Sequence, residues 1–292
     1  MKILNHKVKR GNQDIIIAAF GDFQYGNPAC SVPTAKKFLK FAKDTAKRFK
    51  TELVWVGIGD YTDLLSPSNR LAWKQSGIYS SSRRTIQART VEPIIKECRD
   101  ILAPYMAGKT IAMAQGHHYM LLEGGLKDKL GKKHFHTDSW LASELGTPED
   151  GFFFGSAIIK LEFPDGTIYR MHACHGEGNS VSNTYGLQKL LNQARGWSNV
   201  QMHIMGHTHK PGISSFSQLS EVLNPKTGKS ELVAQQIPLI TGGSFLRSFT
   251  ICENGAENYP ETKQLTSVPL GGIIVLVRAK KGKIEQVPMA LL

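Results

Sequence analysis

The chain has 292 residues, of which 41% are hydrophobic, and this is enough for one large domain and too apolar for a disordered chain. Its formal net charge of +12 favours partners or substrates that carry phosphate. No apolar run approaches the roughly 20 residues of a membrane-spanning helix, and the N-terminal stretch is too polar for a signal peptide. We therefore expect a cytoplasmic protein with no membrane contact.

The four cysteines lie far apart in the sequence, at Cys30, Cys98, Cys174 and Cys252. They form no CxxC pair, which argues against a zinc ribbon or a redox motif. A disulfide framework is also not expected in a chain of this length. We expect free, buried thiols.

Five apolar runs each end at a glycine that is adjacent in sequence to an aspartate or a histidine. In chain order they span residues 14–22, 52–60, 109–118, 167–176 and 200–209. Continuous apolar runs of this length are typical of strands buried on both faces. Helical patterns lie between several of them, at residues 34–49, about 82–105 and 186–193. Alternating strands and helices predict an α/β fold, in which ligands bind at the carboxyl ends of the strands.

The first predicted helix, in the stretch Thr34–Lys50, is amphipathic. Its expected inward side consists of Phe38, Leu39, Ala42, Thr45, Ala46 and Phe49, and six lysines fall largely on the other side. We interpret the lysine side as a solvated face, and contact with nucleic acid is the less favoured alternative.

The five strand ends are expected to gather polar side chains at one place. These residues are Asp22, Asp60, His117, His118, His175, His207 and His209. A single strand-end aspartate usually shapes a turn, but five of the ten histidines together with two acids are difficult to explain in that way. Mixed Asp and His ligands suit Mn, Fe or Zn, and two such ions can activate water for attack on a phosphoester.

The same blocks resemble the calcineurin-like metallophosphoesterases, whose pattern is DxH, GDxxD, GNH followed by an acid, a His–Gly strand end, and GHxH. Here they read Asp22-Phe23-Gln24, Gly59-Asp60-Tyr61-Thr62-Asp63, Gly116-His117-His118-Tyr119, His175-Gly176 and Gly206-His207-Thr208-His209. Single blocks are weak evidence, whereas the ordered set is specific. The resemblance implies two packed, mainly β sheets flanked by helices in one domain of residues 1–292, with about 64–105 as a helical insertion overhanging the site.

The resemblance also implies two divalent metal ions, which could be Mn, Fe, Zn or Ni, with Mn favoured. Asp22, Gln24 and His209 would hold the first ion, Asp60 would bridge, and His117, His175 and His207 would hold the second. A hydroxide bridging the metals would be the nucleophile. His118 would protonate the leaving oxygen, and Asp63 would orient His118.

Three residues depart from the family pattern. Gln24 replaces a histidine, and its amide oxygen is a weaker ligand. His117 replaces an asparagine and lacks the NH₂ group that could bond to phosphate. Tyr119 replaces an acid; it could contact substrate, but we favour a space-filling role.

Residues outside these blocks offer further substrate contacts. Arg83, Arg84 and Arg89 could meet phosphate, as could Asn179 and Arg195, although a solvent-facing role is equally expected.

His172 and His203 are interpreted as structural, and the segment Lys132–Asp138 as a surface loop. The tail beyond His209 has strand composition with hairpin turns and is expected to complete a second sheet.

The function expected from this set is hydrolysis of phosphate esters, with diesters preferred. The basic composition and the lack of an arginine directly after Asp63 favour a phosphodiesterase over a phosphomonoesterase. A nuclease acting on DNA or RNA is one alternative. A non-catalytic binding scaffold with a degraded metal site is another, suggested by Gln24 and His117. The sequence does not specify an oligomeric state.

Overall fold

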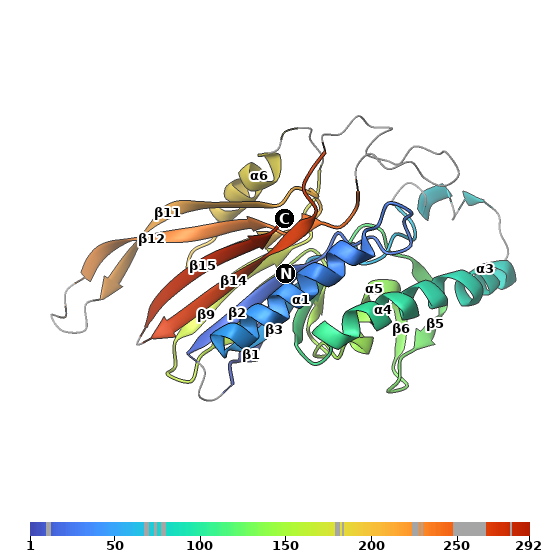
Figure 1. The fold of residues 1–292 in the computed structure, drawn as a ribbon, viewed down its shortest axis with the longest axis horizontal. Coiled ribbons are helices and arrows are strands. Elements are labelled where there is room, and N and C mark those ends of the chain that lie inside the picture. The colour runs from blue at the N-terminus through green and yellow to red at the C-terminus, as the bar shows by residue number, and fades with distance from the viewer. Residues whose placement is uncertain are drawn as a thin grey trace.

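The chain folds into two β-sheets that pack face to face, with helices on the outer face of each (Figure 1). The computed structural model describes residues 1–292 except 10–12, 67–69, 73–74, 77–79, 179–181, 183, 224–227, 229, 248–266 and 281. This layering confirms the expected fold class. Within the described residues, no helix is long and apolar enough to cross a membrane.

The first sheet contains the strands predicted at residues 14–22, 52–60 and 109–118. Its order is β13 (Gly243–Ser244), β14 (Gly271–Lys280), β2 (Asp14–Phe20), β3 (Glu52–Gly57), β4 (Thr110–Ala114) and β7 (Phe152–Phe153), and β15 (Lys283–Leu291) pairs with β14. Strands β2, β3, β4 and β7 are parallel, so their carboxyl ends lie at the same edge.

The second sheet contains the other two predicted runs. Its order is β1 (Lys2–Lys7), β8 (Ser156–Glu162), β9 (Ile168–Cys174), β10 (Met202–Met205), β12 (Ser230–Thr241) and β11 (Gly212–Leu223). Strands β9, β10 and β12 are parallel. A separate hairpin is formed by β5 (Leu121–Lys127) and β6 (Lys133–His136).

Helices cover the outer faces of both sheets. Figure 1 shows α1 (Val32–Phe49) lying over β2 and β3, with α4 (Glu92–Met106) beside it. The α3 helix (Ser80–Ile86) and the π-helical segment η1 (Gln87–Val91) lead into α4, and α5 (Thr137–Glu144) follows β6. The α6 helix (Tyr185–Ala194) packs on the second sheet.

The fold has four layers, namely helices, the first sheet, the second sheet and a further helix. The alternation of side chains along β2 explains how the first sheet contacts the layer on each of its sides. Ile16, Ala18 and Phe20 belong to the core beneath α1 and α4. Ile15 and Ile17 belong to the core between the two sheets. Because both faces of β2 are buried, the strand reads as an uninterrupted apolar run rather than an alternating one.

Two sequence-based predictions are wrong in detail. Phe49 is 38% exposed, because it lies in the last turn of α1 beyond the core. The segment Lys132–Asp138 is not a surface loop: it forms β6 and the start of α5. There, His134 and His136 are both buried, and His134 is bonded to Asp128. A buried face made of two histidines gives no apolar signal in the sequence.

The segment predicted as an overhanging insertion contains two kinds of structure. The α4 helix contributes Ile95, Cys98, Leu102 and Met106 to the core beneath the first sheet, so it belongs to the helix layer. Residues before α4 include Arg70, which reaches the loop after β4.

Candidate metal centre

The candidate site lies where the carboxyl ends of the two sheets meet. Asp22, Asp60 and His117 follow β2, β3 and β4 of the first sheet, and His175 and His207 follow β9 and β10 of the second. Asp22 connects the two sheets, because its carboxylate accepts a hydrogen bond from the His207 backbone N–H at 2.8 Å.

The backbone of these loops adopts unusual conformations. Asp22, Gln24, Asp60, His207 and His209 have φ angles of 46°, 49°, 53°, 67° and 56°, which lie in the left-handed region. This region is disfavoured for residues other than glycine, so tertiary contacts must hold them there. Carbonyl oxygens provide some of these contacts: Asp22 donates its N–H to Gly59, and Gln24 donates its N–H to Asp60.

Close approach of the loops depends on a glycine in the block after β4. A Cβ atom on Gly116 would lie 2.1 Å from the backbone nitrogen of Asp60. Only glycine therefore lets His117 and His118 come close enough for both of their backbone N–H groups to bond to the Asp60 carboxylate.

One group of potential ligands contains two acids and a histidine. One side-chain oxygen or nitrogen from each of Asp22, Asp60 and His209 lies within 4.8 Å of the others. The Gln24 Nε2 atom lies 3.2 Å from His209 Nε2, so this amide reaches the same group. Rotating the amide by half a turn would present its oxygen at that place.

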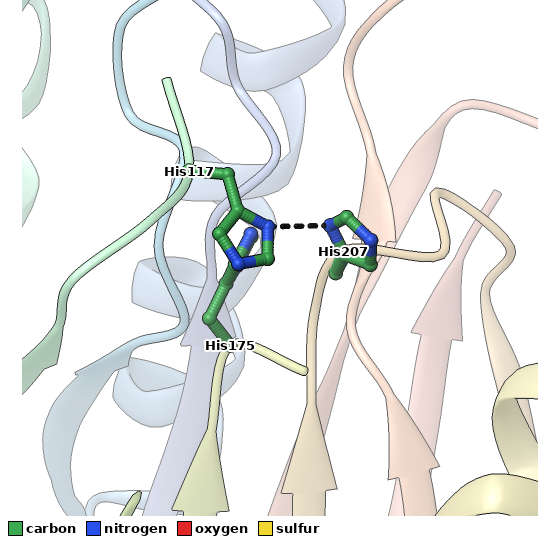
Figure 2. Close-up of side chains that lie close together, drawn as sticks. All are labelled: His117, His175 and His207. Carbon is green, nitrogen blue, oxygen red and sulfur yellow. Dashed lines mark hydrogen bonds between the residues drawn. The ribbon is translucent and has the colours of Figure 1, made fainter. Parts of the chain in front are cut away.

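A second group consists of three histidines. Ring nitrogens of His117, His175 and His207 also lie within 4.8 Å of one another. Figure 2 shows the Nδ1 atoms of His117 and His207 pointing toward each other, with His175 beside them, and these two atoms are 3.1 Å apart. His175 Nδ1 bonds to the Ile58 carbonyl at 2.6 Å, which leaves Nε2 free to act as a ligand, 3.2 Å from Asp60 Oδ2.

Burial and mutual charge shift the pKa of several of these groups. Burial raises the pKa of Asp22 to about 8 and lowers the pKa of His207 to about 3 and of His209 to about 4. Burial opposes charge on His175 too, but the Asp60 carboxylate prevails and raises the pKa of His175 to about 9. His207 and His209 are therefore neutral near pH 7, which is the form that binds metal.

Unsatisfied atoms support a metal-binding role for both groups. Asp22 Oδ1 and His175 Nε2 are buried and make no hydrogen bond; the polar atoms beside them are His209 Nε2 at 3.5 Å and Asp60 Oδ2 at 3.2 Å, respectively. A divalent ion in each group would satisfy these atoms, and the mixture of carboxylate and imidazole suits Mn, Fe or Zn. The residues present therefore fit a pair of divalent ions, with Asp60 next to both groups.

A histidine and an acid form a separate pair beside the ligands. His118 Nδ1 lies 2.6 Å from Asp63 Oδ1, and Asn27 Nδ2 donates to the other Asp63 oxygen at 2.6 Å. Burial opposes a charged imidazole, but this bond and the nearby acids raise the pKa of His118. The arrangement fixes the His118 ring and leaves its Nε2 as the proton-carrying atom.

Sequence analysis missed Arg70, which holds the loop that carries His117 and His118. Its guanidinium donates to the carbonyl oxygens of Leu65, His117 and Tyr119, and it lies 3.9 Å from the centre of the Tyr119 ring. The Tyr119 ring also stacks on His136, with 4.0 Å between ring centres. These contacts hold the Tyr119 ring against Arg70 and His136, and its space-filling role stays a prediction.

Asp138 is a second residue that the sequence did not indicate. It is buried at the start of α5, and its carboxylate accepts the Gly116 N–H at 2.9 Å. Burial raises its pKa to about 7. Asp138 therefore supports the loop after β4 from α5, which lies outside the five sequence blocks.

The structure does not bring the predicted substrate-binding residues together as it does the candidate metal ligands. Arg83 lies on α3 and pairs with Glu123 of β5 at 3.3 Å, and Arg84, Arg89 and Arg195 are exposed. Asn179 lies outside the described residues. The roles of these residues stay predictions.

No protein family matches the chain by sequence, and no curated protein matches it either. Similar solved structures include Vps29 from Cryptosporidium parvum, with a TM-score of 0.37 and 11% identity over 95% of this chain and 98% of that one. Vps29 from Entamoeba histolytica complexed with zinc has a TM-score of 0.34 and 12% identity, over 94% and 98%. GAP50 from Plasmodium has a TM-score of 0.34 and 13% identity, over 96% and 89%. Similarity at this level adds no argument about ligands or activity, and the two-sheet architecture rests on the strand topology described above.

Proposed function

We propose that the chain is a phosphoester hydrolase that depends on two divalent metal ions and prefers diesters. The observation that carries this proposal is the pair of ligand groups, Asp22–Asp60–His209 and His117–His175–His207, which share a border at Asp60. The hydrogen-bonded pair of His118 and Asp63 beside them supports a catalytic rather than a purely structural site.

The ligands have distinct roles in this proposal. Asp22, Gln24 and His209 would hold one ion, and His117, His175 and His207 would hold the other, with Asp60 beside both groups. When bound, the ions supply Lewis acidity, which lowers the pKa of water and offsets the negative charge of the phosphoryl group. The ordering of the protein ligands by backbone bonds keeps this arrangement fixed during the reaction.

His118 is the general acid in this proposal. Its Nδ1 is occupied by Asp63, so the proton available for transfer is on Nε2. Protonation of the leaving oxygen avoids the release of an alkoxide, and a positioned acid typically contributes about 10²–10⁴-fold to the rate. Asp63 holds the ring orientation and stabilises the protonated imidazole.

The preference for diesters rests on composition and on one position of the sequence. The chain carries a formal charge of +12, and Leu64 stands directly after Asp63. A nuclease is the alternative within the same reaction class, and it predicts activity that falls steeply with salt. A non-catalytic binding scaffold is the alternative outside that class.

The experiment that tests the proposal compares two substrates, bis-p-nitrophenyl phosphate and p-nitrophenyl phosphate. Metal-free protein is assayed with and without added Mn²⁺, and bound metal is counted by elemental analysis. We expect Mn²⁺-dependent cleavage with the diester cleaved faster. Bound metal with no cleavage of either ester would contradict the catalytic assignment for simple esters, and no bound metal would favour the scaffold.

A further inference from the structure

The strand β11 forms an open edge of the second sheet. One side of it pairs with β12 along all 12 residues, from Gly212 opposite Thr241 to Leu223 opposite Ser230. On its other side, no strand of the described chain pairs with it. Figure 1 shows β11 at the outer margin of the molecule, beside β12.

The other sheet edges in the described chain carry features that discourage pairing. Such features are short length, charged side chains and proline. The edge strands β7 and β13 have two residues each. Strand β1 contains Lys2 and Lys7, and β15 contains Lys283, Glu285 and Pro288. Strand β11, in contrast, has neither charge nor proline from Gly212 to Ser220.

The two faces of β11 differ. Phe216 packs against the core beneath α6, and Gln218 donates to the Trp197 carbonyl, so the face of even-numbered residues is covered at these two positions, whereas Ser214 is exposed. The face of odd-numbered residues presents Ile213, which is 44% exposed, and Leu219, which is 68% exposed. Two apolar side chains near the two ends of the uncharged stretch Gly212–Ser220 are thus exposed.

We propose that β11 pairs antiparallel with β11 of a second copy of the chain, about a two-fold axis at Phe216. In this register, Ile213 of each copy lies opposite Leu219 of the other, and Ser215 lies opposite Ser217. A two-fold interface requires a surface that is complementary to itself, and cross-strand apolar pairs stabilise a sheet. Backbone hydrogen bonds between the two edges would join two six-stranded sheets into one.

The symmetry of this stretch favours a second copy over an unrelated segment, because Ile213 and Leu219, its exposed apolar side chains, lie at equal distances along the strand on either side of Phe216. Each copy carries a formal charge of +12, which opposes self-association. The stretch from Gly212 to Ser220 adds no charged side chain to the contact. A strongly acidic peptide would find no basic side chain on this stretch to pair with. The inference is independent of the proposed hydrolase activity.

The test uses charge at the two serines that face each other in this register. Sedimentation of the wild-type chain over about a hundredfold range of concentration should reveal a species of twice 32.3 kDa. The double variant S215K/S217K places lysine opposite lysine and should be monomeric, as should S215E/S217E. An equimolar mixture of the two variants should recover the dimer, because lysine then faces glutamate.

Two controls make the outcome decisive. Val287→Lys adds the same charge to the edge strand β15 and should leave the dimer intact. Circular dichroism confirms that each serine variant folds, and if a double variant does not fold, the single variants S217K and S217E replace the pair. A monomeric wild-type chain would overturn the proposal and leave this edge to a segment of another protein. A dimer unaffected by both double variants would also overturn it.

Discussion

At the scale of single residues, Asp60 connects three of the loops that build the candidate site. Its carboxylate accepts the backbone N–H groups of His117 and His118 and lies 3.2 Å from His175 Nε2. Its backbone carbonyl accepts the N–H of Phe23 and of Gln24. Although burial opposes ionisation, the charge of His175 holds the pKa of Asp60 well below its usual range. Asp60 is thus an ionised group at the border of both ligand groups.

Replacing His118 tests its role separately from metal binding. His118→Asn should keep the bound metal, because His118 belongs to neither ligand group, and should reduce kcat by about 10²–10⁴-fold. The loss should be larger with a diester whose leaving group is an alcohol than with a p-nitrophenyl ester, because p-nitrophenolate leaves without protonation. His6→Asn, on β1, is the matched control. Equal losses with both leaving groups would contradict an acid role.

At the scale of elements, the loop after β4 is held by residues from outside the sheet. Arg70 bonds to the carbonyl oxygens of His117 and Tyr119, on either side of His118. Asp138 holds the Gly116 N–H from α5. The position of one candidate ligand, His117, and of the proposed acid, His118, therefore depends on segments that carry no candidate ligand themselves.

Removing the Arg70 contacts should loosen this loop. We expect Arg70→Met to weaken binding of the second metal ion by about 10–100-fold, which is typical for residues that orient ligands. Titration of metal-free protein with Mn²⁺ measures this change. The control is Arg84→Met, which removes the same charge from an exposed position on α3. Unchanged affinity in Arg70→Met would show that the loop holds its shape without the guanidinium.

Strands β9 and β10 bury a pair of histidines on the outer face of the second sheet. His172 and His203 lie side by side in register, with ring centres 5.3 Å apart, and His172 stacks on Trp197. Neither ring nitrogen of His203 has a hydrogen-bond partner. Burial lowers the pKa of His172 to about 4 and of His203 to about 3.

This pair should make the fold sensitive to acid. An unfolded histidine binds a proton below about pH 6.5, whereas the folded pair stays neutral until about pH 4. Stability should therefore fall as pH decreases through this window, by up to about 1.4 kcal/mol per pH unit for each histidine. Urea unfolding of metal-free protein at pH 7 and pH 5 measures the loss. His203→Leu should lose less stability than wild type between these pH values, and an equal loss would contradict the assignment.

Element-scale prediction from the sequence succeeded where burial leaves a strong pattern. Strands β2, β3 and β4 are buried on both faces and α1 is amphipathic, so their sequences reveal them. The aspartates and histidines that lie next to a glycine at the strand ends also indicated the two candidate ligand groups. Arg70 and Asp138 could not be found in this way, because the hydrogen bonds that hold the loop are with backbone groups and need no partner of a particular residue type. Strand β11 is rich in serine and gives no apolar signal.

At the scale of the whole molecule, the candidate metal centre joins the two sheets. The first ligand group takes Asp22 and Asp60 from the first sheet and His209 from the second, and the second group takes His117 from the first and His175 and His207 from the second. Each bound ion would therefore link the first sheet to the second at one end of the core between them.

Metal removal should consequently lower the stability of the entire fold. With free ion at about 100 times its dissociation constant, binding adds about 2.7 kcal/mol to the free energy of unfolding, which corresponds to several degrees in Tm. Calorimetry before and after chelation, and again after Mn²⁺ is restored, measures this difference. In Asp60→Asn, chelation should leave Tm nearly unchanged. A wild-type Tm that is indifferent to chelation would show that the ligand groups hold no metal.

The left-handed backbone at Asp22, Gln24, Asp60, His207 and His209 has a consequence for how such a chain can change over generations. Each of these positions costs the fold about 1 kcal/mol that glycine would not incur. Glycine would relieve this cost, but at Asp22 and Asp60 it would also remove carboxylates that accept backbone hydrogen bonds from neighbouring loops. Selection for stability alone would therefore favour glycine only where the side chain makes no such bond, whereas selection for metal binding at the proposed site would retain all five side chains.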